Sequence, residues 1–206
     1  MKQYVMGNGA IALGALSAGV RLVAGYPGTP SSEIIETVSK YPHEGVHLEW
    51  SVNEKAALEV AVAAAYSGAR AMVTMKQMGL NVASDPLMSV AYIGVKGGLV
   101  IVSADDPGPI SSQTEQDTRR YADFCRIPVF DPASPEEAYQ MIQDAFEYSE
   151  KYNTPVLFRP TTRVCHAYAA IETPESFTPG NFDGFERDTG RWVIFPRLNL
   201  SFFRTF

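Results

Sequence analysis

The sequence predicts an α/β domain of three layers, a parallel sheet with helices on both faces. The chain has 206 residues, of which 46% are hydrophobic, so one domain with a sizeable core is expected and disorder of the whole chain is excluded. Short apolar runs alternate with longer helical patterns, which is typical of βαβ units with right-handed crossovers. The run over residues 98–103 is almost continuously apolar, as expected for a strand buried on both faces.

The first two predicted βα units lie in the first third of the chain. Residues 21–25 favour a strand, and a helix is expected over residues 31–40. Thr29 is a good N-cap for this helix, and Pro30 suits its first position. Residues 46–52 predict the next strand.

The middle of the chain continues the alternation. An alanine-rich helix is expected over residues 53–66, and Gly68 provides a signal for its end. A strand follows over residues 71–75, then a helix over residues 79–90 despite Pro86. The apolar strand over residues 98–103 comes next.

The remaining elements follow a polar loop over residues 104–114. A helix is expected over residues 115–124 and a short strand over 128–130. Ser134 caps a long helix over 135–151. The last predicted strand covers residues 155–159.

The chain is expected to consist of one α/β domain over residues 1–166 and an irregular C-terminal linker or arm over residues 167–206. The second part is rich in proline and glycine and shows little periodicity. Its last dozen residues suggest a truncated or frame-altered product. At the other end, no strand is expected before the glycine-rich stretch at residues 7–14, whose spacing does not match a dinucleotide-binding motif. A helix packed closely on the sheet is the favoured interpretation.

Composition and charge exclude several classes of protein. The chain carries 17 Lys and Arg against 23 Asp and Glu, a net charge of −6, and its one basic pair is Arg119-Arg120, so no nucleic acid partner is expected. Its two cysteines, Cys125 and Cys165, exclude a disulfide scaffold and a cysteine-rich metal site carried by this chain alone. No apolar run is long enough to span a membrane. Glycines and Asn8 interrupt the apolar N-terminus, so secretion is disfavoured and a cytoplasmic location is expected.

Glu54 is the first candidate for chemistry. Ser51-Val-Asn-Glu54 has the spacing of a capping box, which would account for this carboxylate without any catalytic role and is the favoured explanation on spacing alone. The alternative is that the carboxyl group follows a strand in an apolar context and exchanges protons near neutral pH. The sequence leaves both interpretations open.

The other candidate groups give weaker signals. The turn at residues 26–32 offers hydroxyls and backbone amides at a helix N-terminus, which suits an anion, but ordinary capping by Thr29 is the favoured interpretation. Asp105-Asp106 is either a metal pair or, as is more usual beside Pro107-Gly-Pro109, a turn device. The histidines, at positions 43, 47 and 166, suggest no catalytic triad.

Four post-strand segments, in this order and at this spacing, resemble the N-terminal, pyrimidine-binding domain of 2-oxoacid:ferredoxin oxidoreductases. The resemblance covers roughly residues 3–165 and is strongest to the alpha subunits of indolepyruvate ferredoxin oxidoreductases. The segments are Gly25-Tyr-Pro-Gly-Thr-Pro-Ser-Ser-Glu33, Glu49-Trp-Ser-Val-Asn-Glu-Lys-Ala-Ala57, Lys76-Gln-Met-Gly-Leu-Asn81 and Ser103-Ala-Asp-Asp-Pro-Gly-Pro109.

The resemblance implies a thiamine-diphosphate-binding fold and oxidative decarboxylation of a 2-oxoacid to an acyl-CoA. Glu54 would hydrogen-bond the pyrimidine ring nitrogen and help the cofactor to lose its thiazolium proton. Lys76, Gln77 and Met78 would approach the pyrimidine or the substrate, and Thr29 would lie near the substrate carboxylate. Gly28 stands where pyruvate-type relatives carry a bulkier residue, so we expect room for a large arylpyruvate such as indolepyruvate.

The resemblance also implies what this chain lacks. The magnesium and diphosphate site and the iron–sulfur clusters would lie on other segments or subunits, so the isolated chain is expected to be inactive. Ferredoxin and coenzyme A would serve the full complex, and a homodimer is expected. The alternatives are another 2-oxoacid as substrate, or a non-catalytic, dimerising remnant of the same fold.

Overall fold

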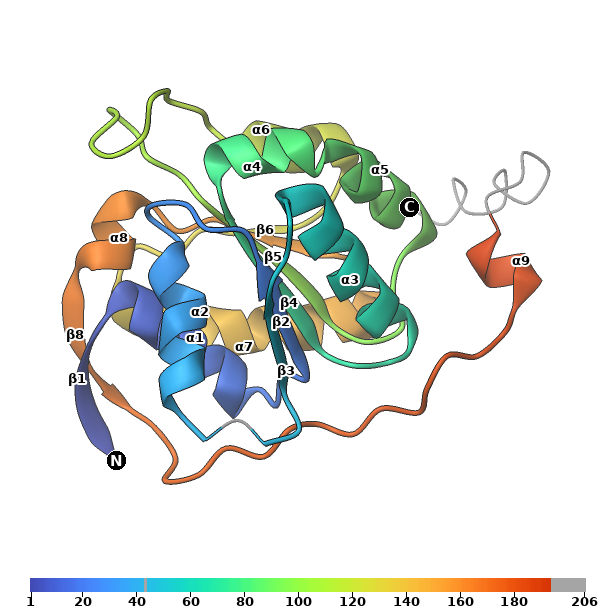
Figure 1. Ribbon diagram of the computed structural model, residues 1–206, viewed down its shortest axis with the longest axis horizontal. Coiled ribbons are helices and arrows are strands. Elements are labelled where there is room, and N and C mark those ends of the chain that lie inside the picture. The colour runs from blue at the N-terminus through green and yellow to red at the C-terminus, as the bar shows by residue number, and fades with distance from the viewer. Residues whose placement is uncertain (43, 194–206) are drawn as a thin grey trace.

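The computed structural model describes residues 1–42 and 44–193 and contains a six-stranded parallel sheet (Figure 1). All neighbouring strands in this sheet pair in parallel, which confirms the predicted fold class. The strand order is β3-β2-β4-β5-β7-β6. The strands are β2 (Leu22–Gly25), β3 (His47–Trp50), β4 (Ala71–Lys76), β5 (Leu99–Ala104), β6 (Val129–Phe130) and β7 (Val156–Phe158).

Helices cover both faces of this sheet. One face packs against α1 (Gly7–Ser17), α2 (Ser32–Lys40) and α7 (Pro135–Tyr152), and the other against α3 (Glu54–Tyr66) and α5 (Ser84–Ile93). Successive residues of a strand point to opposite faces. Met72 of β4 therefore joins the first core, and its neighbour Val73 joins the second.

Two helices differ from the prediction. The single helix expected over residues 79–90 is a pair, α4 (Gln77–Val82) and α5, separated at Ala83. The helix expected from residue 115 begins later, as α6 (Arg119–Cys125). It is shortened because the preceding residues are held elsewhere: the Thr114 carbonyl accepts a hydrogen bond from Gln77, and the Thr118 amide donates to Asp105.

Both ends of the α/β domain contain strands that the sequence analysis did not predict. β1 (Lys2–Met6) pairs antiparallel with β8 (Tyr168–Glu172) in a separate two-stranded sheet, after the short helix α8 (Thr162–His166). Tyr168–Glu172 alternates between exposed and buried residues, but five residues give too short a pattern to recognise without the partner strand. The expectation of irregular structure throughout residues 167–206 is therefore wrong for this strand.

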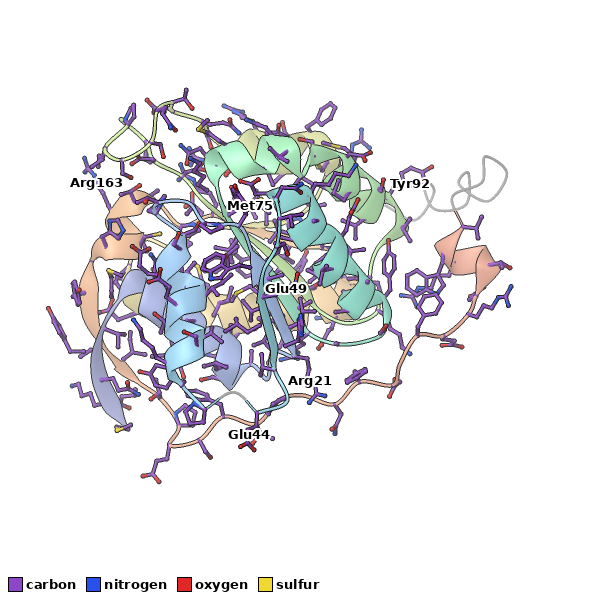
Figure 2. The ribbon with its side chains drawn as sticks, viewed as in Figure 1. Arg21, Glu44, Glu49, Met75, Tyr92 and Arg163 are labelled. Carbon is purple, nitrogen blue, oxygen red and sulfur yellow. The ribbon has the colours of Figure 1, made fainter. Side chains whose placement is uncertain are left out.

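Residues 173–188 form an extended arm that crosses the amino ends of the parallel strands (Figure 1). The amides of Gly180 and Gly184 donate to the Gly19 and Ser67 carbonyls. Arg21, labelled in Figure 2, stacks on the ring of Phe182 in the arm, 5.0 Å from its centroid. The arm ends in α9 (Thr189–Trp192). The last dozen residues, which suggested truncation, lie outside the described part of the chain.

The glycines of α1 allow close packing, but on helices α7 and α8 rather than on the sheet that the sequence analysis favoured. A Cβ atom on Gly14 would lie 2.6 Å from the Tyr139 carbonyl oxygen of α7, and one on Gly7 would overlap the Val164 carbonyl. The capping prediction for α7 is also confirmed, because the Ser134 hydroxyl accepts a hydrogen bond from the Glu137 amide. None of the helices in the described part of the chain has the length and apolar character of a membrane span.

Candidate active site

The predicted functional loops meet at the carboxyl ends of β2, β3 and β4, where open parallel sheets bind their ligands. Because β2 lies between β3 and β4, the turn after β2 separates Glu54, at the start of α3, from Lys76, at the end of β4. Two backbone hydrogen bonds fix this arrangement: Ser51 donates to the Gly25 carbonyl and Tyr26 to the Thr74 carbonyl.

Glu54 is the first residue of α3, and its carboxylate is not used for capping. Asn53 is the N-cap, and its side chain accepts a hydrogen bond from the Ala56 amide at 2.9 Å. The Ser51 hydroxyl donates to Glu49 at 2.7 Å, so the capping box considered for Ser51 and Glu54 is wrong. The helix begins at Glu54, so Asn53 and not Ser51 is the residue whose side chain reaches an amide of the first turn.

The Glu54 carboxylate is buried and unpaired. The residue is 7% exposed, and no group in the described part of the chain forms a hydrogen bond or an ion pair with its carboxylate. It lies against Gly79 of α4: a Cβ atom on Gly79 would be 2.6 Å from the Glu54 Cγ atom and 2.7 Å from Oε1. Glycine at position 79 thus makes the space that this carboxylate occupies.

Lys76, Gln77 and Met78 directly precede Gly79, which lies against Glu54, but the three residues have different surroundings. Lys76 is partly buried, with its aliphatic stem against Gly28. Gln77 is fully buried; its amide nitrogen donates to the Thr114 carbonyl at 3.0 Å, whereas its Oε1 atom has no partner. Met78 is partly buried, and no contact distinguishes its role.

The turn after β2 differs from the predicted cap. Helix α2 begins at Ser32, with Ser31 rather than Thr29 as its N-cap. The amide and hydroxyl of Ser31 both donate to the Gly28 carbonyl, and the Gly28 amide donates to the Ser32 hydroxyl. These bonds close the turn internally and make the capping role proposed for Thr29 wrong. The exposed Thr29 hydroxyl makes no hydrogen bond within the described residues.

Asp105 and Asp106 organise the loop after β5 and show no metal site. Asp106 is buried and accepts hydrogen bonds from Thr162 and from the amides of Ile110, Ser111 and Ser112. Burial opposes its charge, but these bonds outweigh burial and lower the pKa of Asp106 to about 2. Asp105 accepts hydrogen bonds from Arg159 at 2.7 Å and from Thr118.

The remaining sequence candidates lie apart from this site. Among the described residues, no group of three or more His, Cys, Asp and Glu side chains is placed to hold a metal. His47 contacts Glu49 on the surface, and His166 lies 4.0 Å from Glu33. His43 lies outside the described residues. The cysteines are free.

Gln116 is a site residue that the sequence analysis missed. Its side chain donates to the Gln77 carbonyl and exchanges hydrogen bonds with Asn81, so it fixes the loop after β5 to α4. No sequence signal identifies it, because glutamine in a polar loop has no characteristic spacing.

Unpartnered buried polar atoms gather at this end of the sheet. In the described part of the chain, five buried side-chain atoms have no hydrogen-bond partner. Thr74 and Ser103 lie near the carboxyl ends of β4 and β5, and Gln77 begins α4. Ser112 is in the loop after β5, and Asn8 is in the first turn of α1, beside Pro30. Buried polar groups are normally paired, so these atoms lack hydrogen bonds that a water molecule or a ligand would supply. The atoms are Asn8 Oδ1, Thr74 Oγ1, Gln77 Oε1, Ser103 Oγ and Ser112 Oγ.

Comparison with known families defines the class of protein. A family described as pyruvate flavodoxin/ferredoxin oxidoreductase, thiamine diphosphate-binding, matches residues 13–188. The chain belongs to this family, as the resemblance in the sequence predicted.

Individual relatives refine this assignment. The chain is 50% identical over 198 residues to the indolepyruvate oxidoreductase subunit IorA of Thermococcus kodakarensis, covering 93% of this chain and 31% of that protein. It is 30% identical over 182 residues to the 2-oxoglutarate synthase subunit KorA of Methanothermobacter thermautotrophicus, covering 84% of this chain and 48% of that protein. The chain thus spans about a third of the length of the indolepyruvate oxidoreductase subunits that it matches.

A solved structure shows the same fold. The 2-oxoglutarate:ferredoxin oxidoreductase from Magnetococcus marinus, determined with 2-oxoglutarate, coenzyme A and succinyl-CoA bound, superposes with a TM-score of 0.74 at 22% identity. The match covers 89% of this chain and 34% of that chain.

Proposed function

We propose that this chain is the pyrimidine-side domain of a thiamine-diphosphate-dependent oxidoreductase that decarboxylates an arylpyruvate such as indolepyruvate to an acyl-CoA. The observation that carries the proposal is the Glu54 carboxylate, buried, without a partner and held against Gly79. A buried carboxylate without a partner is costly unless a ligand supplies the missing hydrogen bond.

The residues at the site fit a thiamine pyrimidine ring. The ring presents nitrogens and an exocyclic amine, which match the unpartnered carboxylate of Glu54. When bound, thiamine diphosphate supplies the nucleophilic carbon and the electron sink for decarboxylation. Glu54 would accept a hydrogen bond from a protonated ring nitrogen and hold that proton in place. Mg²⁺ and the diphosphate would be held by another segment.

The choice of an arylpyruvate rests on the relatives. Indolepyruvate oxidoreductase subunits from several archaea are 46–50% identical to this chain, whereas a 2-oxoglutarate synthase subunit is 30% identical. Gly28 and the exposed Thr29 remain our candidates for substrate contacts.

The remaining components are part of the same proposal. The chain spans 31% of such a relative, so other domains or subunits would carry the iron–sulfur clusters and the sites for ferredoxin and coenzyme A. Assembly as a homodimer in the cytoplasm is expected, with the unpartnered carboxyl end of the sheet covered by the neighbouring domain.

Titration calorimetry with thiamine diphosphate and Mg²⁺ tests the proposal. The isolated chain should bind weakly or not at all, and the assembly with the remaining segments should bind tightly. In that assembly, Glu54→Gln should lower turnover by about 10²- to 10⁴-fold, the usual contribution of a proton-transfer group. Glu59→Gln is the matched control, because Glu59 lies on the same helix and is exposed.

Two outcomes would overturn the proposal. Tight binding by the isolated chain would contradict the shared site, and full turnover by Glu54→Gln would remove the role of this carboxylate. No binding under any condition, by the chain or by the assembly, would favour the non-catalytic remnant instead.

A further inference from the structure

Lys76 differs from the other partly buried lysines because it has no acidic partner. Lys55 lies 2.8 Å from Asp85, and Lys96 lies 3.5 Å from Asp183. No carboxylate in the described part of the chain forms an ion pair with Lys76. A partly desolvated cation without a counter-charge costs stability, and this cation is the last residue of β4.

Gly28 fixes where the Lys76 side chain lies. A Cβ atom on Gly28 would be 3.1 Å from the Lys76 Cδ atom and 3.2 Å from its Cγ atom. The stem therefore runs across the turn after β2, over the one residue that leaves space for it. The Lys76 stem therefore occupies the space beside Gly28 in which the sequence analysis expected room for a large substrate.

The carboxylate of Glu54 and the ammonium group of Lys76 thus belong to the same candidate site without pairing. Glu54 lies against Gly79 and Lys76 against Gly28, and they form no ion pair with each other. Neither charge is therefore offset by the other within the described residues. Separate charges suit a site whose ligands bring an anion to one and a hydrogen-bond donor to the other.

We propose that the ammonium group of Lys76, whose aliphatic stem lies against Gly28, binds the carboxylate of the 2-oxoacid substrate. The proposal rests on the proposed function and assigns Lys76 to substrate rather than to the pyrimidine ring. The exposed Thr29 hydroxyl, next in sequence to Gly28, supplies a second donor for the same carboxylate. In a chain with a net charge of −6, this cation is what draws an anionic substrate to the site.

The test compares two unreactive ligands of the same shape, indole-3-propionate and its uncharged amide, indole-3-propionamide. Neither has a 2-oxo carbon. Their dissociation constants are measured by calorimetry on the assembled oxidoreductase loaded with thiamine diphosphate and Mg²⁺. The wild-type assembly should prefer the acid by about 10- to 100-fold, the value of one hydrogen bond to a charged group.

Variants then locate the source of that preference. Lys76→Met should bind acid and amide equally, and Lys76→Arg should retain part of the preference. Gly28→Ala should give an intermediate value, because the stem must move by a few tenths of an ångström. Lys40→Met, which removes an exposed lysine at the end of α2, is the control and should behave like the wild type.

The outcomes separate this proposal from the proposed function. Cofactor affinity is measured first, and a wild-type assembly that binds no thiamine diphosphate counts against the proposed function. If cofactor binds, the assignment of Lys76 is rejected by either of two results: no acid preference in the wild type, or an undiminished preference in Lys76→Met. Loss of the preference with unchanged cofactor affinity supports it.

Discussion

Replacing Gly79 with alanine moves the Glu54 carboxylate without removing it. The new Cβ atom would lie 2.6 Å from the Glu54 Cγ atom, whereas ordinary contacts begin at 3.4 Å. The glutamate side chain must therefore retreat by about 1 Å, and misplacement on this scale costs about 100-fold in rate. Stability should change little, because alanine gains about 1 kcal/mol over glycine in a helix, against about 1–3 kcal/mol for overpacking.

The assay measures both quantities in parallel. Turnover of the 2-oxoacid is followed in the assembled oxidoreductase, and the free energy of unfolding is measured by urea denaturation. Gly9→Ala is the matched control: Gly9 is also a buried helical glycine, but the nearest atom to its new Cβ would lie at 3.4 Å. Wild-type turnover by Gly79→Ala would refute the claim that the position of Glu54 matters.

Two further predictions concern the loop after β5. The lowered pKa of Asp106, about 2, stabilises the fold above about pH 4 and loses that effect as the pH falls toward 2. Asp106→Asn should therefore cost about 2 kcal/mol at neutral pH, with a deficit that shrinks between pH 4 and 2 in urea titrations; parallel curves would contradict this. Arg159→Met should cost about 3–5 kcal/mol, because it leaves Asp105 buried without its cation. The double variant Asp105→Asn, Arg159→Met should recover part of that loss, and equal losses would contradict the ion-pair argument.

The parallel strands were predictable because most of them, such as β4 and β5, are short apolar runs between turn residues. The capping of α7 by Ser134 was equally local. The β1–β8 ribbon was not predictable, because it joins Lys2–Met6 to Tyr168–Glu172, and neither strand shows a pattern by itself. The start of α6 was also missed, since tertiary hydrogen bonds to Gln77 and Asp105 override its helical pattern.

The location of the site was predictable, but the state of its side chains was not. Loops after parallel strands meet at one edge, so Glu54, Thr29 and Lys76 could be grouped from the sequence. Whether Glu54 took part in capping α3 depended on whether Ser51 or Asn53 was the N-cap. Both residue types are good N-caps, so the sequence alone does not distinguish them. Only the structure shows that Asn53 takes this position and leaves the carboxylate unpaired.

The contrast between satisfied and unsatisfied charges gives the functional argument its physical basis. Asp105 and Asp106 are as buried as Glu54, yet they receive hydrogen bonds from Arg159, Thr118, Thr162 and loop amides. The fold thus provides hydrogen-bond partners for the buried carboxylates of the loop after β5. That it leaves Glu54 unpaired, together with the unpartnered atoms around it, indicates that the missing partners come from outside this chain. The proposed cofactor, shared with another domain, would meet that requirement, because it would supply a donor to Glu54 while the second domain would cover the open end of the sheet.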